Sequence, residues 1–128
     1  GKVGLAWSTE NQTVLTSDVP TPLYYREKFF VLSDLRKVLS RVQPKSGKVE
    51  WSLDLPGKYK WRSSPTGGDG KIFLMNHNGE VLVVSSESGK ILTHAKMGDS
   101  YDDNTRSSVA LAGNNLFIRT NEILYCIE

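Results

Sequence analysis

The feature that most constrains the fold is a repeat with a period of 42–44 residues. Three hydrophobic runs align, residues 28–32, 71–75 and 116–119, at offsets of 43 and 44. The Ser-Gly-Lys of residues 46–48 returns at residues 88–90, at an offset of 42. Several independent matches that share one period indicate a repeat protein rather than a chance echo.

The middle unit shows what one period contains. Asn78-Gly79 is a strong hairpin signal, because both residues tolerate a positive φ. Turn clusters at residues 67–70 and 88–89 lie on either side of it. Four short strands are predicted around these turns, at residues 63–66, 71–76, 80–85 and 90–97.

Four antiparallel strands in each period of this length are typical of a β-propeller blade. We therefore predict an all-β fold, a partial β-propeller of about three four-stranded blades. Residues 1–128 would form a single domain, with approximate repeats at 7–50, 51–94 and 95–128.

One segment carries a competing signal. Val31, Leu35, Val38 and Val42 fall at helical spacing within a run that lacks Gly and Pro. The aligned segment of the next unit has Asn78-Gly79 in its middle, and a Gly-centred turn does not belong inside a helix. The repeat therefore predicts a hairpin turn at residues 33–36.

Composition narrows the class of protein but not its function. The 128 residues are 38% hydrophobic and 23% charged, which is typical of a globular domain. A net charge of +2 is too small to indicate nucleic acid or an anionic membrane as the partner. A single cysteine, Cys126, excludes an internal disulfide and a multi-cysteine metal site. We expect no membrane span, because no apolar run is long enough.

The stretch from Arg41 to Trp51 reads RVQPKSGKVEW. It resembles the tryptophan-docking motif of the quinoprotein-like (PQQ-binding-like) β-propellers, roughly Ala-x-Asp-x-x-Thr-Gly-x-x-x-Trp. Arg41 and Gln43 stand at the Ala and Asp positions, and a second copy keeps the turn but has Thr93 at the Trp position. The residues that fit the docking motif are Ser46, Gly47, Trp51, Ser88 and Gly89.

The resemblance implies that Trp51 lies between neighbouring sheets, stacked on the backbone near a Gly. A buried Trp removes roughly 150–250 Å² from water, which stabilises the contact by several kcal/mol. We therefore expect Trp51→Ala to lower the free energy of unfolding by about 3–5 kcal/mol.

The number of blades raises the question of closure. The chain holds not quite three periods, whereas closed propellers usually have four to eight blades. We favour a part of a longer propeller, with closure by a homodimer second and an open arc third. The segment around Trp7 would be the outer strand of a preceding blade or would pair with the last blade.

Catalytic and metal-binding motifs give little support to an enzyme. Quinoprotein dehydrogenases of this fold use PQQ, Ca²⁺ and a catalytic Asp, and many have an adjacent Cys pair. This chain has no Cys pair, and none of its positions takes those site residues, so we expect no enzyme activity and no cofactor. The oxygen-rich cluster is the candidate for Ca²⁺, although its spacing does not fit an EF-hand and a solvated acidic loop is favoured: Asp99, Asp102, Asp103 and Asn104.

Two further stretches have binding character. The Gly67–Lys71 stretch superficially resembles a phosphate loop, but Ile72 follows the Lys and no helix does, so a hairpin turn is predicted. His77 and His94 have no partners at ligand spacing. The candidate binding surface interleaves basic and aromatic side chains, with an inter-blade loop as the favoured interpretation: Lys58, Tyr59, Lys60, Trp61 and Arg62.

These observations favour a non-catalytic binding or scaffold module that recognises a protein or a small ligand. The resemblance extends to the propellers of bacterial outer-membrane protein assembly, which implies a periplasmic or exported setting. The first alternative is a fragment of a PQQ-dependent dehydrogenase. The second is nucleic-acid binding through residues 58–62, which the charge does not favour.

Overall fold

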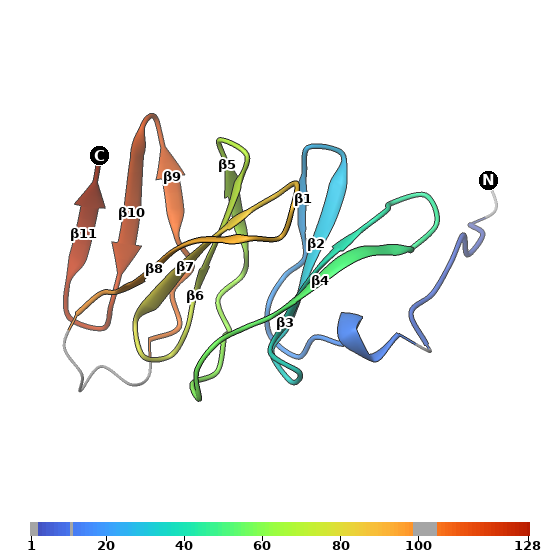
Figure 1. The fold of residues 1–128 in the computed structure, drawn as a ribbon, viewed down its shortest axis with the longest axis horizontal. Helices are drawn as coiled ribbons and strands as arrows, with labels where there is room; N and C mark the ends of the chain where they lie inside the picture. The colour runs from blue at the N-terminus through green and yellow to red at the C-terminus, as the bar shows by residue number, and fades with distance from the viewer. Residues whose placement is uncertain (1–2, 11, 99–104) are drawn as a thin grey trace.

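The computed structural model describes residues 3–10, 12–98 and 105–128, and it is built from antiparallel strands (Figure 1). A short 3-10 helix, η1 (Thr13–Leu15), precedes the first sheet. Nothing in these ranges forms a helix of the length and apolarity needed to traverse a bilayer. The strands form three sheets in chain order, and the all-β partial propeller is confirmed.

Blade 1 contains four strands, β1 (Leu23–Tyr25), β2 (Lys28–Ser33), β3 (Val38–Val42) and β4 (Val49–Asp54). Blade 2 repeats this order with β5 (Thr66–Gly68), β6 (Lys71–Met75), β7 (Glu80–Ser85) and β8 (Ile91–Lys96). Blade 3 has three strands, β9 (Ala110–Ala112), β10 (Asn115–Arg119) and β11 (Leu124–Ile127).

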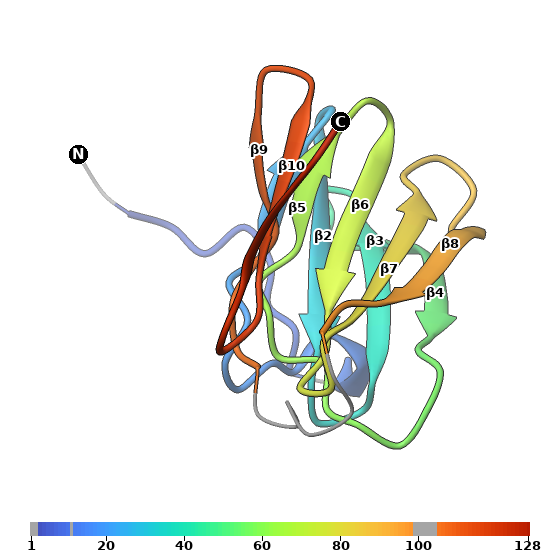
Figure 2. The ribbon, with the colours of Figure 1, turned by 90° about the vertical axis from the view of Figure 1, so that its left-hand side faces the viewer.

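The three blades stand side by side, and the two ends of the chain lie at opposite ends of the row (Figure 1). The view from the side shows the sheets one behind another, with the N-terminal segment projecting away from them (Figure 2). Each sheet is twisted and each covers a face of the next, as in stacked repeats.

Equivalent residues of the repeat occupy equivalent places in the sheets. Phe30 pairs with Leu23 on one side and Arg41 on the other. Phe73 takes the same position in blade 2, between Thr66 and Val83, and Phe117 takes it in blade 3, between Ala110 and Cys126. The offsets of 43 and 44 in the sequence are therefore offsets between blades.

The hydrophobic core consists of two clusters, one between each pair of neighbouring blades. The first cluster joins blades 1 and 2 and includes Phe30, Leu39, Leu74 and Leu82. The second joins blades 2 and 3 around Phe73, Met75, Val81, Val109 and Ile118. Because each β-sheet has apolar residues on both faces, a blade is stable only when neighbours cover it.

The turns agree with the prediction in part. β2 ends at Ser33 and β3 begins at Val38, so the turn predicted against the helical spacing is confirmed. Gly67 and Gly68 belong to β5, which corrects their placement in a turn cluster. The turn itself is formed by Asp69 and Gly70, which have positive φ values of 50° and 71°.

The hairpin between β6 and β7 forms where Asn78-Gly79 predicts it, but its loop is four residues long, residues 76–79. Gly79 has a positive φ of 72°. Asn76 shapes the loop, because its side-chain oxygen accepts hydrogen bonds from the backbone N–H groups of Asn78 and Glu80, each at 3.0 Å. This is a side-chain turn of the kind that Asn favours.

Candidate functional site

The candidate site of this chain lies along the seams between blades. We call the contact between blades 1 and 2 the first seam and the contact between blades 2 and 3 the second seam. The repeat places equivalent residues in both, so any difference between the seams comes from side-chain identity.

Trp51 is the main anchor of the first seam. It lies on β4 of blade 1, and its indole packs on Gly89 in the β7–β8 turn of blade 2, where an added methyl group would lie 2.9 Å from the ring. Its Nε1 donates a hydrogen bond of 3.1 Å to the carbonyl oxygen of Glu87. Gly89 has a positive φ of 73°, so a glycine is needed both for the turn and for the approach of the ring.

Trp7 makes the same contact one blade earlier. Its ring packs on Gly47, where an added methyl group would lie 2.6 Å from a ring carbon, and its Nε1 donates to the carbonyl oxygen of Pro44 at 2.8 Å. Gly47 has a positive φ of 71°. The two turns also share a detail, because Ser46 and Ser88 each accept a hydrogen bond from the backbone N–H two residues on.

Two further side chains of blade 1 cross the first seam. The Arg41 guanidinium donates hydrogen bonds to the carbonyl oxygens of Ser86 and Glu87, at 2.9 and 3.2 Å. Tyr25 covers Gly67, and its hydroxyl accepts a hydrogen bond of 2.8 Å from the backbone N–H of Gly70. The first seam is therefore closed by an indole, a guanidinium and a phenol.

The second seam has none of these three anchors. Trp51 pairs with Arg41 in blade 1, and the equivalent pair in blade 2 is Thr93 with Val83. Tyr25 pairs with Lys28, and its equivalent, which pairs with Lys71, is Gly68. Thr93 and Val83 are therefore smaller than the Trp51 and Arg41 that they replace, and Gly68 has no side chain in the place of Tyr25.

One hydrogen bond recurs in both seams. It lies in the segments that lead into β1, β5 and β9, the first strand of each blade. The backbone N–H of Thr21 donates to the hydroxyl of Ser64 at 2.9 Å. One blade later the N–H of Ser64 donates to the hydroxyl of Ser108 at 3.0 Å. We call this series the hydroxyl ladder.

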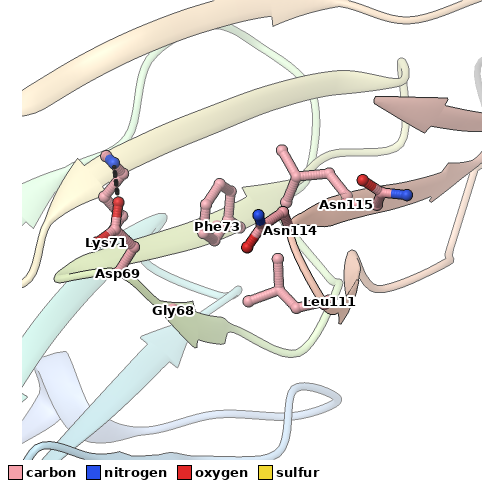
Figure 3. Close-up of a pocket in the computed structure, with 9 residues that line it drawn as sticks. Gly68, Asp69, Lys71, Phe73, Leu111, Asn114 and Asn115 are labelled. Atoms are coloured by element: carbon pink, nitrogen blue, oxygen red, sulfur yellow. Dashed lines mark hydrogen bonds and ion pairs between the residues drawn. The ribbon is translucent and has the colours of Figure 1, made fainter. Parts of the chain in front are cut away.

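A groove of about 450 Å³ lies in the second seam, between the β5–β6 and β9–β10 hairpins (Figure 3). Gly68 leaves space that Tyr25 fills in the first seam, and Leu111 enters part of it, with a methyl group 2.4 Å from where a Cβ at Gly68 would lie. Figure 3 shows Leu111 and Asn114 beside Phe73, with Asn115 further along β10. The groove therefore combines an apolar floor with amide groups.

One end of the groove is charged. Lys71 and Asp69 form an ion pair at 2.9 Å, and this hydrogen bond lowers the pKa of the Asp69 carboxyl. The Asp69 side chain is 89% exposed, so solvent screens the pair and both charges stay available to a ligand.

The basic and aromatic residues of positions 58–62 do not form one exposed patch. Trp61 is fully buried in the first core cluster and donates a hydrogen bond of 3.0 Å to the carbonyl oxygen of Pro56. Arg62 pairs with the buried carboxylate of Asp34 at 3.0 Å. Lys58 and Lys60 are exposed and Tyr59 is half-buried.

His77 is a half-buried side chain in a basic corner. Burial lowers the pKa of its imidazole, and the nearby charges of Arg106, Arg62 and Lys60 lower it further. Its Nε2 is buried and makes no hydrogen bond with the described residues. His94 lies on β8, where it contacts Glu80 at 3.2 Å.

The predicted oxygen-rich cluster, Asp99, Asp102, Asp103 and Asn104, lies outside the described residues. Within the ranges 3–10, 12–98 and 105–128, no three His, Cys, Asp or Glu side chains come together in the manner of a metal site. These ranges therefore give no ligand set for the Ca²⁺ that the resemblance implies.

The docking motif indicates Trp51 and Gly89, whose side chain and backbone the structure brings together, but no motif indicates the groove or the contacts of Tyr25 and Arg41 across the seam. The signal was present in the repeat, because a position-by-position alignment places Gly68 opposite Tyr25 and Val83 opposite Arg41.

No protein-family model and no curated protein matches the sequence. The fold is nevertheless found in solved structures. The quinohemoprotein alcohol dehydrogenase of Comamonas testosteroni is similar with a TM-score of 0.72 at 18% identity, over 92% of this chain and 19% of that one. BamB from Moraxella catarrhalis gives 0.60 at 9% identity, over 77% and 29% of the two chains.

The Pan2 WD40 domain of Neurospora crassa is similar as well, with a TM-score of 0.59 at 16% identity, over 80% of this chain and 30% of that one. The chain thus spans between about a fifth and a third of these neighbours. The likeness to BamB and the quinoprotein dehydrogenases confirms the propeller fold that the docking motif indicates. At these identities it shows the fold and no activity.

Proposed function

We propose that this chain is a non-catalytic binding module of a PQQ-like propeller and that the groove of the second seam binds an extended segment of a protein partner. The observation that carries the proposal is the replacement of Tyr25 by Gly68 at the equivalent place. The same architecture closes one seam with an aromatic side chain and leaves a groove in the next.

The groove has the chemistry that a peptide requires. Its volume of about 450 Å³ falls in the usual range of ligand sites, roughly 300–1,000 Å³. Asn114 and Asn115 each offer an amide donor and an amide acceptor, which match the N–H and C=O groups of a peptide backbone. Phe73 and Leu111 provide an apolar surface for one of its side chains.

The test is to fill the groove. Gly68→Tyr introduces the residue of blade 1 at a position without a positive φ, and the flexible end of Leu111 can move aside. Peptides would be selected from a random displayed library on the wild-type protein, and their affinities measured by fluorescence anisotropy. We expect Gly68→Tyr to weaken binding at least about tenfold, as loss of one well-packed contact does.

Thr93→Tyr is the matched control, because it adds the same side chain to the second seam on the exposed strand β8. It should leave the affinity unchanged. Failure to select any peptide, or equal weakening by both substitutions, would contradict the proposal.

The alternative is a part of a PQQ-dependent dehydrogenase, which the name of one solved neighbour, a quinohemoprotein alcohol dehydrogenase, makes worth testing. Addition of PQQ and Ca²⁺ should then shift the absorbance of PQQ and raise the melting temperature. Our proposal predicts neither change. The proposed setting in the bacterial envelope rests on the resemblance alone.

A further inference from the structure

The lysine at one end of the groove, Lys71, is neutralised differently from its equivalent in blade 1. That equivalent is Lys28, because Lys28 pairs with Tyr25 where Lys71 pairs with Gly68. Lys28 forms an ion pair with Glu50 on the outer strand β4 of its own blade, at 2.5 Å. Blade 1 therefore compensates this lysine within its own sheet.

In blade 2 the position of Glu50 is taken by Leu92. Each is the residue that a register shift leaves out of the pairing between the third and fourth strands of its blade. An apolar side chain cannot pair with the ammonium group of Lys71, whose carboxylate partner is instead Asp69 in the β5–β6 turn. Because Asp69 is exposed to solvent, this pair compensates the charge of the lysine only in part.

A second positive charge reaches the same end of the groove from blade 1. The guanidinium of Arg26 lies over the β5–β6 turn, with Nη1 3.1 Å from the place of a Cβ at Gly70. Tyr25 supports it there, because the guanidinium carbon lies 5.5 Å from the centre of the Tyr25 ring. The hydrogen bond from Lys71 lowers the pKa of the Asp69 carboxyl, and the charge of Arg26 lowers it further. Two cationic side chains therefore face one carboxylate.

The rest of the described lining carries no charge that offsets this excess. Asn115 is the equivalent of Lys71 in blade 3, since it pairs with Ala112. Figure 3 shows the charged pair at one end of the groove, with Phe73 and the residues of blade 3 further along it. The residues that blade 3 contributes are all uncharged: Leu111, Gly113, Asn114, Asn115 and Leu116.

We propose that the groove selects an acidic segment, in which an Asp or Glu side chain meets Lys71 and an apolar side chain two residues away meets Phe73. Lys71 and Phe73 are two residues apart on β6, and both line the groove. Alternate residues of a strand lie on one face, roughly 6.5 Å apart, and an extended peptide has the same spacing. This specificity rests on the proposed function, since it concerns the peptide that the groove binds.

The first test is the sequence of the peptides selected on the wild-type protein. We expect enrichment of peptides in which Asp or Glu stands two residues from a large apolar residue. Replacement of that acid by its amide should weaken binding by about threefold to fivefold, as loss of a partly exposed ion pair does. Amidation of the C-terminus should leave the affinity unchanged, because the carboxylate comes from a side chain.

The second test exchanges the charges of protein and peptide. Lys71→Glu should weaken binding of the acidic peptide at least about fivefold, because an attraction becomes a repulsion. The same variant should bind a peptide with Lys in place of the acid more tightly than the wild-type protein does, and that binding shows that the variant folds. Arg26→Gln, in an exposed turn, should weaken the acidic peptide by a smaller factor of about two.

Lys60→Glu is the matched control, because it makes the same change of charge far from the groove. Lys60 is exposed, and its carbonyl oxygen accepts a hydrogen bond of 2.9 Å from the N–H of His77. His77 follows the end of β6 that lies away from Lys71. Lys60→Glu should therefore change the affinity by less than about twofold, since salt screens charges at this separation.

Enrichment of the acidic pattern, together with the exchange of charge preference in Lys71→Glu, supports the proposal. Selected peptides without an acid, equal affinities of Lys71→Glu and Lys60→Glu for the acidic peptide, or loss of binding on amidation of the C-terminus would overturn it. In each of those cases the groove would still bind peptides. Failure to select any peptide would instead overturn the proposed function, and the specificity with it.

Discussion

The two seams of this protein are built by the same repeat and are held in different ways. In the first seam Trp51, Arg41 and Tyr25 all reach from blade 1 onto backbone groups of blade 2. In the second seam the equivalent residues are Thr93, Val83 and Gly68, and a groove lies there instead. The difference shows that strand pairing forms each blade, whereas a few side chains decide whether neighbouring blades close or leave a groove.

Among substitutions that test the difference between the seams, loss of the Trp51 indole should have the largest effect on stability. Trp51→Ala should lower the free energy of unfolding by about 3 kcal/mol, because the ring packs on Gly89 and a cavity would remain. Thr93→Ala, at the equivalent place in the second seam, should change it by less than about 0.5 kcal/mol. Chemical denaturation followed by circular dichroism measures both, and a near-native midpoint for Trp51→Ala would show that the first seam does not depend on this residue.

Loss of the Arg41 guanidinium contact should have the second-largest effect on stability. Arg41→Met keeps the length of the side chain but removes its hydrogen bonds to two carbonyl oxygens, for a loss of about 1–2 kcal/mol in the free energy of unfolding. Arg36→Met is the control, since Arg36 is exposed in the β2–β3 turn. Equal destabilisation by the two substitutions in the same denaturation experiment would mean that Arg41 does not tie the blades together.

The phenol contact should be weaker. Tyr25→Phe keeps the ring over Gly67 and removes one hydrogen bond to the backbone N–H of Gly70, which should cost about 1 kcal/mol. Tyr24→Phe removes a hydroxyl from a neighbouring side chain that is 59% exposed, and it should be neutral. Hydrogen exchange at the Gly70 amide gives a local measurement, and unchanged protection in Tyr25→Phe would contradict the contact.

The smallest expected effect is on the pH dependence of stability, through His77 beside the second seam. Burial lowers the pKa of His77 below its ordinary value of 6.5. As the pH falls below that value, the unfolded chain binds a proton before the folded one does, so stability falls with acid in this range. His77→Asn should lose less stability than the wild type between about pH 7 and pH 5. Parallel pH profiles of the two proteins would show that His77 makes no contribution.

The repeat made most of the fold predictable. It placed the turn at residues 33–36 against a helical spacing, because periodicity in one segment is weaker evidence than agreement between two segments. It did not reveal that Gly67 and Gly68 lie in a strand, since Gly ordinarily weakens a strand interior. The structure supplies the reason for Gly67, where the ring of Tyr25 packs against the backbone.

The candidate site was less predictable, because it depends on contacts between repeats. For residues 58–62 the sequence favours an inter-blade loop over a recognition surface, and the structure shows Trp61 of this stretch buried in the first core cluster. In the sequence Gly68 resembles a turn residue, and only alignment of the two blades shows that it takes the place of Tyr25. A side chain that is absent leaves no motif, so a groove of this kind is found only by comparing the blades.

The hydroxyl ladder repeats one contact at the same place in successive blades, from Thr21 to Ser64 and from Ser64 to Ser108. In the first seam the side chains of Trp51, Arg41 and Tyr25 add contacts to the backbone of the next blade. In the second seam the ladder is accompanied by the hydrogen bond from the Thr66 hydroxyl to the carbonyl oxygen of Val109 and by the second core cluster. The ladder therefore sets the spacing of successive blades at one place, whichever side chains occupy the rest of each seam.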